Sequence, residues 1–544
     1  MKNLYSLLIM ALVGTTSASA QWNTNATPRC ILSALYQDAA TGTTKNHGDY
    51  FACSPKAART ADKKTWLAWH TWDAKIVGNI RVPAVRTWLQ LLDINGVPEF
   101  KEPILVNDHA TPTYWSEYAL CVAADGSAIV TVADSRVEEE TSDPTDSPQA
   151  FTPAIYKIDQ KGDFLWGLDG IDFRFTVNSP FTNAYVVGED TYFLFNVQYD
   201  ADVNNPDNGL YMMRINDDGT LAWEKPRQMA TGITTKGQIV PSLDGEFLYF
   251  DDTPDGARVH RFDRDLNEVW GDPVIYDEYK FEGYGMNQYR LASDGNGGAC
   301  VAFVRNMGDF SHNVRVQHIN EDGSLAFGLT GLDAYNANEY DHNYPSIAVN
   351  PRTQEIMVQY ASDNGPEGFV KHQKFTFDGD YLYNEKGFNV ASKNGENSGG
   401  YMFGLTGVGS LPDGDWIAIY RDLAGWNKES IVIRRYDKDG NRVWTKTIGR
   451  EIAPDDINYV VEPEAIYLFY REMQEGKNPG LNIFRIGADG TYNVTYPSGI
   501  EETTRGTEGS NRYYSLDGKQ LSKVRKGINI VRDSDGTVKK FVVK

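Results

Sequence analysis

A short pattern recurs eight times along this chain, and it constrains the fold more than any other feature of the sequence. A full copy has an apolar residue followed by a polar one, two variable residues, a turn glycine and an aromatic residue four positions later, as from Ile215 to Trp223, and the eighth copy, from Ile486 to Val494, is decayed. The glycine or its equivalent stands at Gly96, Gly162, Gly219, Leu266, Gly323, Gly379, Gly440 and Gly490. The first and last of these positions are 394 residues apart over seven intervals, a mean period of about 56. Repeats of this order are typical of propellers, solenoids and similar arrays.

Each copy predicts a β-hairpin. Asp-Gly and Asn-Gly turns supply the positive φ that a tight strand reversal needs. An alternating strand such as 314–319 precedes the turn, and a second turn lies upstream of most copies, followed by an apolar strand such as 299–303. Two hairpins per repeat give four strands, which is one propeller blade. The sequence therefore predicts an all-β, eight-bladed propeller over residues 53–498. Seven blades are the alternative, because the first and last copies are irregular and Val494 replaces the last aromatic residue.

The two ends of the chain differ from the repeats. Residues 1–20 read as a secretory signal peptide, with Lys2, an apolar run and an Ala-Ser-Ala cleavage site ending at Ala20. Residues 21–52 form an N-terminal arm, which either adds a strand to the last blade or lies loosely across one face. Residues 499–511 read as a linker before a small β module at 512–544. We expect an exported protein, secreted or at the cell surface, with the periplasm as the alternative.

The charge of the chain excludes some partners. The net charge is −22, although residues 512–544 carry nine Lys and Arg against three Asp. The remaining chain is therefore still more acidic, and it repels nucleic acid and anionic membranes. We expect neither as a partner.

Cysteines and acidic residues offer two further candidate sites. Cys30 and Cys53 could form a disulfide in an oxidising compartment, which would tie the arm to the first blade. Asp200, Asp202 and Asn204 alternate as oxygen ligands of Ca²⁺ do, although the Gly and Glu of a helix-loop-helix calcium loop are missing. A solvated acidic turn is the alternative. No other cofactor is expected.

The repeat resembles that of the quinoprotein-like eight-bladed propellers, which include pyrroloquinoline-quinone dehydrogenases and BamB-like assembly scaffolds. In that family a strand ending in Asp leads to a Gly turn with Trp four residues later, as in Gly219 and Trp223 here. The resemblance implies that the aromatic residue packs between neighbouring blades. The chain departs from the family in placing the polar residue three positions before Gly, one fewer than usual. It also lacks the adjacent Cys pair of the quinone dehydrogenases, which disfavours pyrroloquinoline quinone as a cofactor.

The C-terminal module resembles the end of a type IX secretion sorting domain. The resemblance rests on a Leu-Asp-Gly-Lys turn at 516–519, a Lys-Gly-Ile-Asn-Ile-Val strand at 526–531 and a final Lys-Lys-Phe-Val-Val-Lys strand. It covers only about 32 residues, fewer than the usual module. It implies the secretion machinery as a partner. A terminal β-hairpin without an address function is the alternative.

We expect function on the face opposite the short turns, because loops carry function more often than the scaffold does. The connections there are rich in polar and aromatic residues. The candidate ligand-binding residues are Tyr114, Trp115, Lys236, Tyr284 and Asn343. Such residues around a cleft suit a glycan or a protein ligand, and we predict a binding protein.

A glycan-active enzyme, a polysaccharide lyase, is the main alternative. His342 with Tyr340 or Tyr344 could remove a proton from an acidic sugar while Arg174 or Lys236 neutralises its carboxylate. His109 lies before the second blade and His342 before the sixth, half a ring apart, so both could face one pocket. A BamB-like assembly scaffold is a second alternative.

Overall fold

The computed structural model describes most of the repeat region and parts of both ends. The described residues are 22–24, 27–33, 35–37, 44–46, 53–77, 80–107, 109, 118–139, 151–173, 181–198, 205–231, 237–253, 256–277, 289–308, 311–335, 341–363, 367–394, 406–423, 429–473, 480–492, 512–514, 520–521, 527–532 and 538–543. The chain divides into two units: Trp22–Asn493, and a second made of Met1–Gln21 with Val494–Lys544. Within the described residues, no helix has the length and apolar character needed to cross a bilayer.

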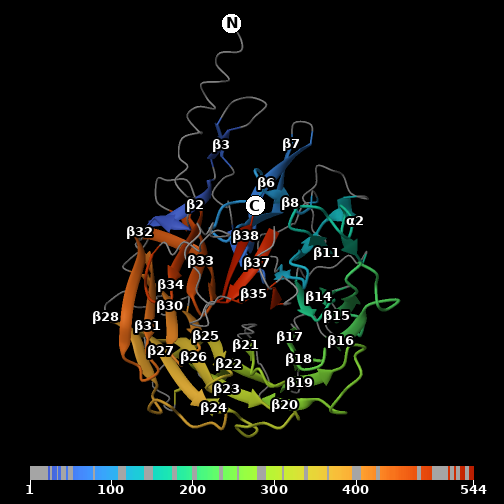
Figure 1. Cartoon of the computed structure of the whole chain (residues 1–544). Helices are drawn as coiled ribbons and strands as arrows, with labels where there is room; N and C mark the ends of the chain where they lie inside the picture. The colour runs from blue at the N-terminus through green and yellow to red at the C-terminus, as the bar shows by residue number, and fades with distance from the viewer. Residues whose placement is uncertain are drawn as a thin grey trace. The chain divides into compact units, whose positions relative to one another are not determined.

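The larger unit is an eight-bladed β-propeller, which confirms the predicted fold class (Figure 1). The first four blades are β5 (Cys53–Arg59), β6 (Thr65–Val77), β7 (Ile80–Leu92) and β8 (Ile104–Leu105); β9 (Leu120–Val122), β10 (Ala128–Asp134), β11 (Thr152–Ile158) and β12 (Ile171–Asp172); β13 (Thr182–Val187), β14 (Asp190–Val197), β15 (Gly209–Ile215) and β16 (Arg227–Thr231); and β17 (Gln238–Pro241), β18 (Phe247–Thr253), β19 (Gly256–Phe262) and β20 (Val274–Asp277).

The other four blades continue around the ring, and β32 contributes to two of them. They are β21 (Arg290–Ser293), β22 (Ala299–Gly308), β23 (Ser311–Ile319) and β24 (Leu332–Asp333); β25 (Asp341–Asn350), β26 (Glu355–Asp363), β27 (Glu367–Thr376) and β28 (Phe388–Asn394); β29 (Thr406–Ser410), β30 (Trp416–Leu423), β31 (Glu429–Tyr436) and the first part of β32 (Arg442–Val461); and the second part of β32, β33 (Ala465–Met473), β34 (Gly480–Gly487) and β2 (Thr27–Ser33).

Four short elements lie outside the blade pattern, and the smaller unit has a sheet of its own. The short elements are β1 (Asn23–Thr24), β3 (Leu35–Gln37), β4 (Thr44–Asn46) and the helix α2 (Arg136–Glu139). The sheet of the smaller unit is antiparallel, in the order β36 (Gln520–Leu521), β35 (Arg512–Tyr514), β37 (Gly527–Arg532) and β38 (Val538–Val543).

The repeated polar residue shapes the turn between the third and fourth strands. In blade 1, Asp93 Oδ1 accepts hydrogen bonds from the backbone N–H groups of Asn95 and Val97, both at 2.8 Å. Gly96 then adopts a φ of 78°, a conformation that glycine reaches without steric strain. The sequence pattern thus specifies a closed turn, which sets the register of the hairpin.

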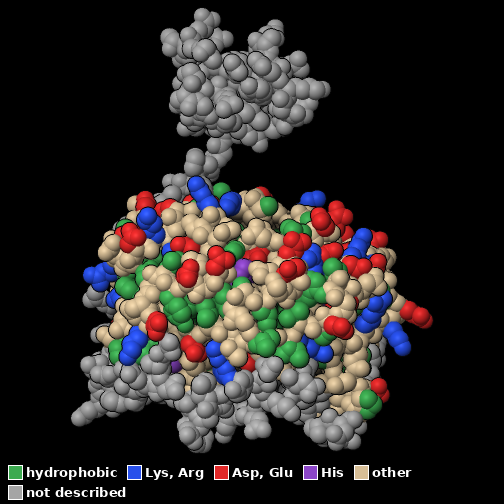
Figure 2. All heavy atoms as spheres, turned by 90° about the horizontal axis from the view of Figure 1, so that it is seen from below, with side chains coloured by type: hydrophobic (Ala, Val, Ile, Leu, Met, Phe, Trp, Pro, Cys, Tyr) green, Lys and Arg blue, Asp and Glu red, His purple; other side chains and the backbone are tan. Residues whose placement is uncertain are grey.

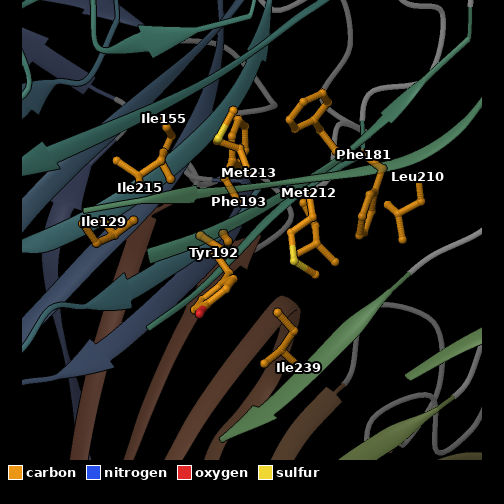
Figure 3. Packing of buried hydrophobic residues seen from close by; sticks show 14 of the residues in the cluster. Ile129, Ile155, Phe181, Tyr192, Phe193, Leu210, Met212, Met213, Ile215 and Ile239 are labelled. Atoms are coloured by element: carbon orange, nitrogen blue, oxygen red, sulfur yellow. The ribbon is translucent and has the colours of Figure 1, made fainter. Parts of the chain in front are cut away.

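The hydrophobic core lies between the blades. One cluster joins Ile129 and Ile155 of blade 2 to Met213 and Ile215 of blade 3 and extends to Ile239 of blade 4 (Figure 3). Strands with both faces buried, such as β10 and β14, read as continuous apolar runs rather than alternating ones. Each blade is therefore stabilised by its neighbours on both sides.

The aromatic residue of one blade packs on the turn glycine of the next. A Cβ added to Gly219 would lie 2.6 Å from Trp166 Cδ1, and one added to Gly323 would lie 3.1 Å from the Trp270 ring. The indole Nε1 also donates to the carbonyl two residues before that glycine, as Trp270 does to Glu321 at 3.0 Å. Trp166 and Trp444 repeat the contact with the next turn. The glycine is thus needed for space as well as for its backbone conformation.

A basic side chain reinforces most of these seams. In seven of the eight copies, a basic residue directly precedes the apolar residue of the repeat: Lys157, Arg214, Arg261, His318, Lys374, Arg435 and Arg485. Arg261 Nη1 donates to the Glu321 carbonyl at 2.6 Å, the same acceptor that Trp270 uses. Arg435 Nη1 donates likewise to Ala488 at 3.0 Å. The sequence analysis did not use this feature, although it is visible in the repeat.

The N-terminal arm closes the ring. Strand β2 pairs with β34, with Arg29 opposite Ile483 and Ser33 opposite Gly480. It supplies the fourth strand of blade 8. Of the two arrangements expected for the arm, the structure shows the added strand.

Candidate functional site

A groove of ≈ 970 Å³ crosses the turns of blade 5. These turns, 294–298 between β21 and β22 and 320–324 between β23 and β24, lie on the side that we call the turn face. The groove is lined by Arg261 and Trp270 of blade 4, by Asp294, Asn296, His318, Asn320, Glu321, Asp322, Ser324 and Ala326 of blade 5, and by Gln354, Phe377 and Asp378 of blade 6. It therefore lies on the opposite side from the face on which we expected function.

A buried polar pair forms part of the groove lining. Asp294 and His318 are 2% and 3% exposed, and Asp294 Oδ2 lies 3.1 Å from His318 Nε2. The other ring nitrogen, Nδ1, lies 3.1 Å from the backbone oxygen of Phe377 in blade 6. Asp294 Oδ1 accepts hydrogen bonds from the backbone N–H groups of Asn296 and Gly298. The pair thus joins both turns of blade 5 to blade 6.

Hydrogen bonds from the protein stabilise the ionised form of the Asp294 carboxylate. Burial raises the pKa of Asp294, but the hydrogen bonds from His318 and from the two backbone N–H groups outweigh it. The pKa is therefore held below its ordinary value of 3.8. Asp294 is ionised at neutral pH and presents a fixed negative charge at the groove.

The walls of the groove hold hydrogen-bonding groups beside an indole. Trp270 is half-buried, because its ring packs on the Gly323 turn while its side lines the groove. The exposed Asn296, Gln354 and Asp378 stand around the opening. Amides donate and accept hydrogen bonds, and carboxylates accept several. This lining can hold a ligand that carries many hydroxyl groups and an apolar face.

Two residues of the groove lining, Ala326 and His318, occupy repeat positions whose side chains differ between the blades. Ala326 directly precedes the aromatic residue, as Ala222 does in blade 3, whereas blades 2, 4, 6 and 7 have Leu165, Val269, Leu382 and Val443 at this position. His318 occupies the position of the long basic side chains, of which Lys and Arg stand in most other blades.

The groove is acidic. Four carboxylates line it, those of Asp294, Glu321, Asp322 and Asp378. The basic groups in the lining are engaged within the protein: Arg261 Nε donates to Glu246 at 2.7 Å, and its Nη1 donates to the Glu321 carbonyl. Figure 2 shows Asp and Glu together with Lys and Arg side chains around a band of hydrophobic side chains on one side of the molecule. An anionic ligand would be repelled here.

Comparisons with known proteins show no family for this chain. No protein-family model and no curated protein matches the sequence. A protein of unknown function from Dyadobacter fermentans DSM 18053 is 12% identical, with a TM-score of 0.35 over 84% of this chain and 97% of its own. A PL25 ulvan lyase bound to -[GlcA(1-4)Rha3S]- is 10% identical, with a TM-score of 0.40 over 81% of this chain and 93% of its own.

A third similar structure is polysaccharide lyase Uly1, which is 9% identical, with a TM-score of 0.38 over 71% of this chain and 93% of its own. The resemblances to quinoprotein-like propellers and to a sorting domain stay predictions.

The structure places His342, the base of the lyase hypothesis, inside the protein. It lies in β25, is 1% exposed, and packs between Tyr335 and Tyr360 at ring-centroid distances of 4.9 and 5.4 Å. Burial lowers its pKa to about 3, and the charge of Lys371 adds to the shift. The ring is thus neutral and covered by aromatic side chains.

The other predicted site residues are described only in part. Asn343 and Tyr344 follow His342 in β25 and are half-buried, and Tyr344 has a φ of 56° beside a register shift. The half-buried His109 holds its backbone oxygen 3.3 Å from Asn107 Nδ2. Nine candidates lie outside the described residues: Tyr114, Trp115, Arg174, Asp200, Asp202, Asn204, Lys236, Tyr284 and Tyr340.

The predicted disulfide and the predicted metal site also involve residues that lie outside the described part of the chain. The side chain of Cys53 is outside the described residues, so its pairing with Cys30 stays a prediction. Within the described ranges, no group of three or more His, Cys, Asp or Glu side chains is arranged to hold a metal ion. The groove residues were not predicted, because the turns were expected to be scaffold. One signal was present in the sequence: His318 stands at a repeat position where the other six basic residues are Lys or Arg.

Proposed function

We propose that this chain is an exported β-propeller that binds a neutral glycan, without transforming it, in the groove over blade 5. The observation that carries the proposal is the combination of a ≈ 970 Å³ groove with amide, hydroxyl and carboxylate groups beside the Trp270 indole. Export through the signal peptide and handling of the C-terminal module by secretion machinery belong to the same proposal.

The chemistry of the lining favours a sugar. Sugar hydroxyls donate and accept hydrogen bonds, so they match Asn296, Gln354 and Ser324 as well as carboxylates. The C–H faces of a pyranose ring are apolar and suit the indole of Trp270. The groove volume of ≈ 970 Å³ is at the upper end of typical small-molecule sites, which leaves room for more than one sugar unit.

The charge of the lining favours a neutral sugar over a uronate or a sulfated sugar. Asp378 and Glu321 lie at the groove, and no basic side chain of its lining is left to pair with an anionic ligand, because Arg261 is engaged with Glu246 and Glu321. A polyanion brought to this surface would meet like charges in a partly desolvated site.

Catalysis is not favoured by the described geometry. A proton acceptor must come within hydrogen-bond distance of the proton that it removes. His342 is 1% exposed, and the groove histidine His318 is engaged with Asp294 and Phe377. A binding role needs neither residue to be accessible.

The test is a binding titration of the full chain with neutral and acidic oligosaccharides by calorimetry. We expect binding to a neutral glycan, about tenfold weaker in Asp378→Asn, because one charge-assisted hydrogen bond is lost. Asp439→Asn is the matched control, since Asp439 directly precedes the turn glycine of blade 7 as Asp378 does in blade 6. Binding only of acidic glycans, only of proteins, or equally by both variants would contradict the proposal.

A further inference from the structure

Blade 5 has a histidine where six other blades have a lysine or an arginine. The position directly precedes the apolar residue of the repeat, and His318 occupies it in blade 5. Lys and Arg keep their charge over the physiological pH range, whereas histidine changes its charge between about pH 5 and 8. What this position does in the ring therefore decides what the protonation of His318 controls.

Blades 4 and 7 each direct two donors to one carbonyl of the next blade. Arg261 and Trp270 of blade 4 both donate to the Glu321 carbonyl. Arg435 and Trp444 of blade 7 share a carbonyl of blade 8 in the same way. Each of these carbonyls lies two residues before the turn glycine of its blade. The basic residue and the indole together thus hold the neighbouring turn.

Blade 5 can supply only one of these two donors. Phe327 stands at the aromatic position, and a Cβ added to Gly379 of blade 6 would lie 3.0 Å from its Cδ1. The phenyl ring fills the same space as an indole but has no N–H group. The carbonyl of Phe377, two residues before Gly379, lies 3.1 Å from His318 Nδ1. His318 therefore does at this seam what a basic residue and an indole do elsewhere.

Both ring nitrogens of His318 face hydrogen-bond acceptors. The Phe377 carbonyl can only accept, so Nδ1 must carry a hydrogen. Nε2 lies 3.1 Å from Asp294 Oδ2, and the other carboxylate oxygen already accepts two backbone N–H groups. The lowered pKa of Asp294 disfavours the protonated acid that could donate to the ring instead. A neutral imidazole has one N–H group, so these two contacts require the doubly protonated cation.

This cation fixes groove residues on two blades. On blade 5 it holds Asp294. On blade 6 it holds the carbonyl of Phe377, whose own N–H donates to the Gln354 carbonyl at 3.0 Å and which is followed directly by Asp378. Gln354 and Asp378 both line the groove. The position of the blade 6 wall relative to Asp294 thus depends on His318.

The charged groups around His318 are mostly acidic. Those that share the groove lining with it are Asp294, Glu321, Asp322, Asp378 and Arg261. Arg261 is engaged with Glu246 and Glu321. Cys300 lies opposite His318 in the β22–β23 pair, and burial raises the pKa of its thiol well above the ordinary value, so the thiol is neutral. An excess of carboxylates favours a cationic ring.

We propose that His318 is a positioning residue of the groove, held with both ring nitrogens protonated, and that loss of either proton releases the blade 6 wall and weakens ligand binding. The effect on binding rests on the proposed glycan-binding function, whereas the protonation itself needs no ligand. A neutral ring would set a nitrogen lone pair against an acceptor, at Phe377 or at Asp294. Binding should therefore fall as the pH rises and His318 becomes neutral.

The protonation state can be measured on the full chain without a ligand. The ring nitrogens of its eight histidines are labelled with ¹⁵N and followed by nuclear magnetic resonance. The signals of His318 are those missing from both His318→Gln and His318→Arg. We expect two protonated ring nitrogens at about pH 7, where free histidine is largely neutral. A neutral His318 ring at this pH would overturn the proposal.

Hydrogen exchange tests the link between this proton and the groove wall. The Phe377 N–H group should lose protection as His318 becomes neutral. The matched control is the Ala488 N–H group, which donates to the Glu464 carbonyl in blade 8 at 2.9 Å, next to a carbonyl held by Arg435. Parallel protection of the two groups across the titration would refute the coupling between His318 and the wall.

Calorimetry with a neutral oligosaccharide over the same pH series tests the effect on binding. Binding to the wild type should become about tenfold weaker as His318 loses a proton, because one hydrogen bond that holds the wall is lost. His318→Arg should not show this fall, since an arginine can hold both acceptors, as Arg435 holds Asp415 and Ala488. His260→Gln, which removes a histidine outside the groove lining, should keep the wild-type profile.

The same fall in His318→Arg, or constant binding while His318 becomes neutral, would overturn the proposal. If no glycan binds at any pH, the proposed function fails, and the ring nitrogens and the Phe377 exchange still decide whether His318 is the cation that holds this wall.

Discussion

The indole of Trp22 packs on Gly96, and its Nε1 donates to the carbonyl of Ile94, 72 residues further along the chain. The other tryptophans of this kind come from the blade itself, as Trp444 does when it packs on Gly490 and donates to Ala488. In the eighth copy of the repeat, Val494 stands at the aromatic position. Trp22 therefore supplies from the N-terminal arm the contact that the last repeat has lost.

The first prediction concerns the strength of this contact. Trp22→Ala should lower the free energy of unfolding by about 3 kcal/mol or more, because a buried aromatic side chain and a hydrogen bond are lost together. Trp22→Phe keeps a ring but removes the donor to Ile94 and should be intermediate. Urea unfolding followed by tryptophan fluorescence and circular dichroism measures both. Equal stability of Trp22→Phe and Trp22→Ala would show that the ring itself contributes little.

The second prediction separates space from backbone conformation. Gly96 and Gly245 both have a positive φ, of 78° and 81°, so alanine at either site costs about 1 kcal/mol or more of backbone strain. An added Cβ at Gly245 meets nothing within 4 Å, whereas at Gly96 it meets the Trp22 ring. Gly96→Ala should therefore destabilise the protein clearly more than Gly245→Ala in thermal unfolding. Equal losses would mean that Trp22 moves aside freely.

The propeller architecture could be predicted from the sequence because a short local pattern repeats in every blade region. The polar residue Asp93 closes the turn at Gly96, and the recurrence of this turn along the chain marks the blades. Ring closure was not accessible in the same way, because Trp22 and Gly96 meet only after the ring has formed. The arm could be assigned to a strand or to a loose segment with equal ease.

The candidate site was harder to predict for two physical reasons. The groove is lined by residues of three neighbouring blades, and a motif within one repeat does not show which residues of other repeats will lie beside it. The lyase hypothesis used His342 because it lies in a connection, but the strand β25 begins before it and buries it against Tyr335 and Tyr360. The sequence around a histidine near the start of a strand does not show whether its side chain is buried or exposed.

The third prediction concerns catalysis. The full chain should give no rise in ultraviolet absorbance from unsaturated uronates when it is mixed with acidic polysaccharides, because the groove repels anions and His342 is covered. His342→Ala should instead lower the melting temperature, since it leaves a cavity between two tyrosines. A rise in absorbance that His342→Ala abolishes would restore the lyase hypothesis.

The fourth prediction concerns the basic side chains of the seams. Lys374 is 1% exposed, and its Nζ lies 2.8 Å from Glu355 Oε2 and 3.2 Å from the Gly414 carbonyl of the next blade. Lys374→Met should cost about 3 kcal/mol, because it leaves a largely buried carboxylate without its partner. The double variant with Glu355→Gln should recover part of this loss. A double-mutant cycle in urea measures the coupling, and additive losses would contradict it.

The last prediction is an acid-sensitive seam at blade 5. The folded pKa of Asp294 lies below its ordinary value, so in acid the unfolded chain binds this proton more readily than the folded chain does. The stabilisation is therefore present above about pH 4 and is lost as the pH falls through the lowered folded pKa. Asp294→Asn should be less stable than the wild type at pH 7, and the difference should shrink steadily towards pH 2. Unfolding titrations at a series of pH values test this, with Asp439→Asn, at a turn of blade 7, as the control. A difference that stays constant from pH 7 to pH 2 would show that Asp294 acts through its shape and not through its charge.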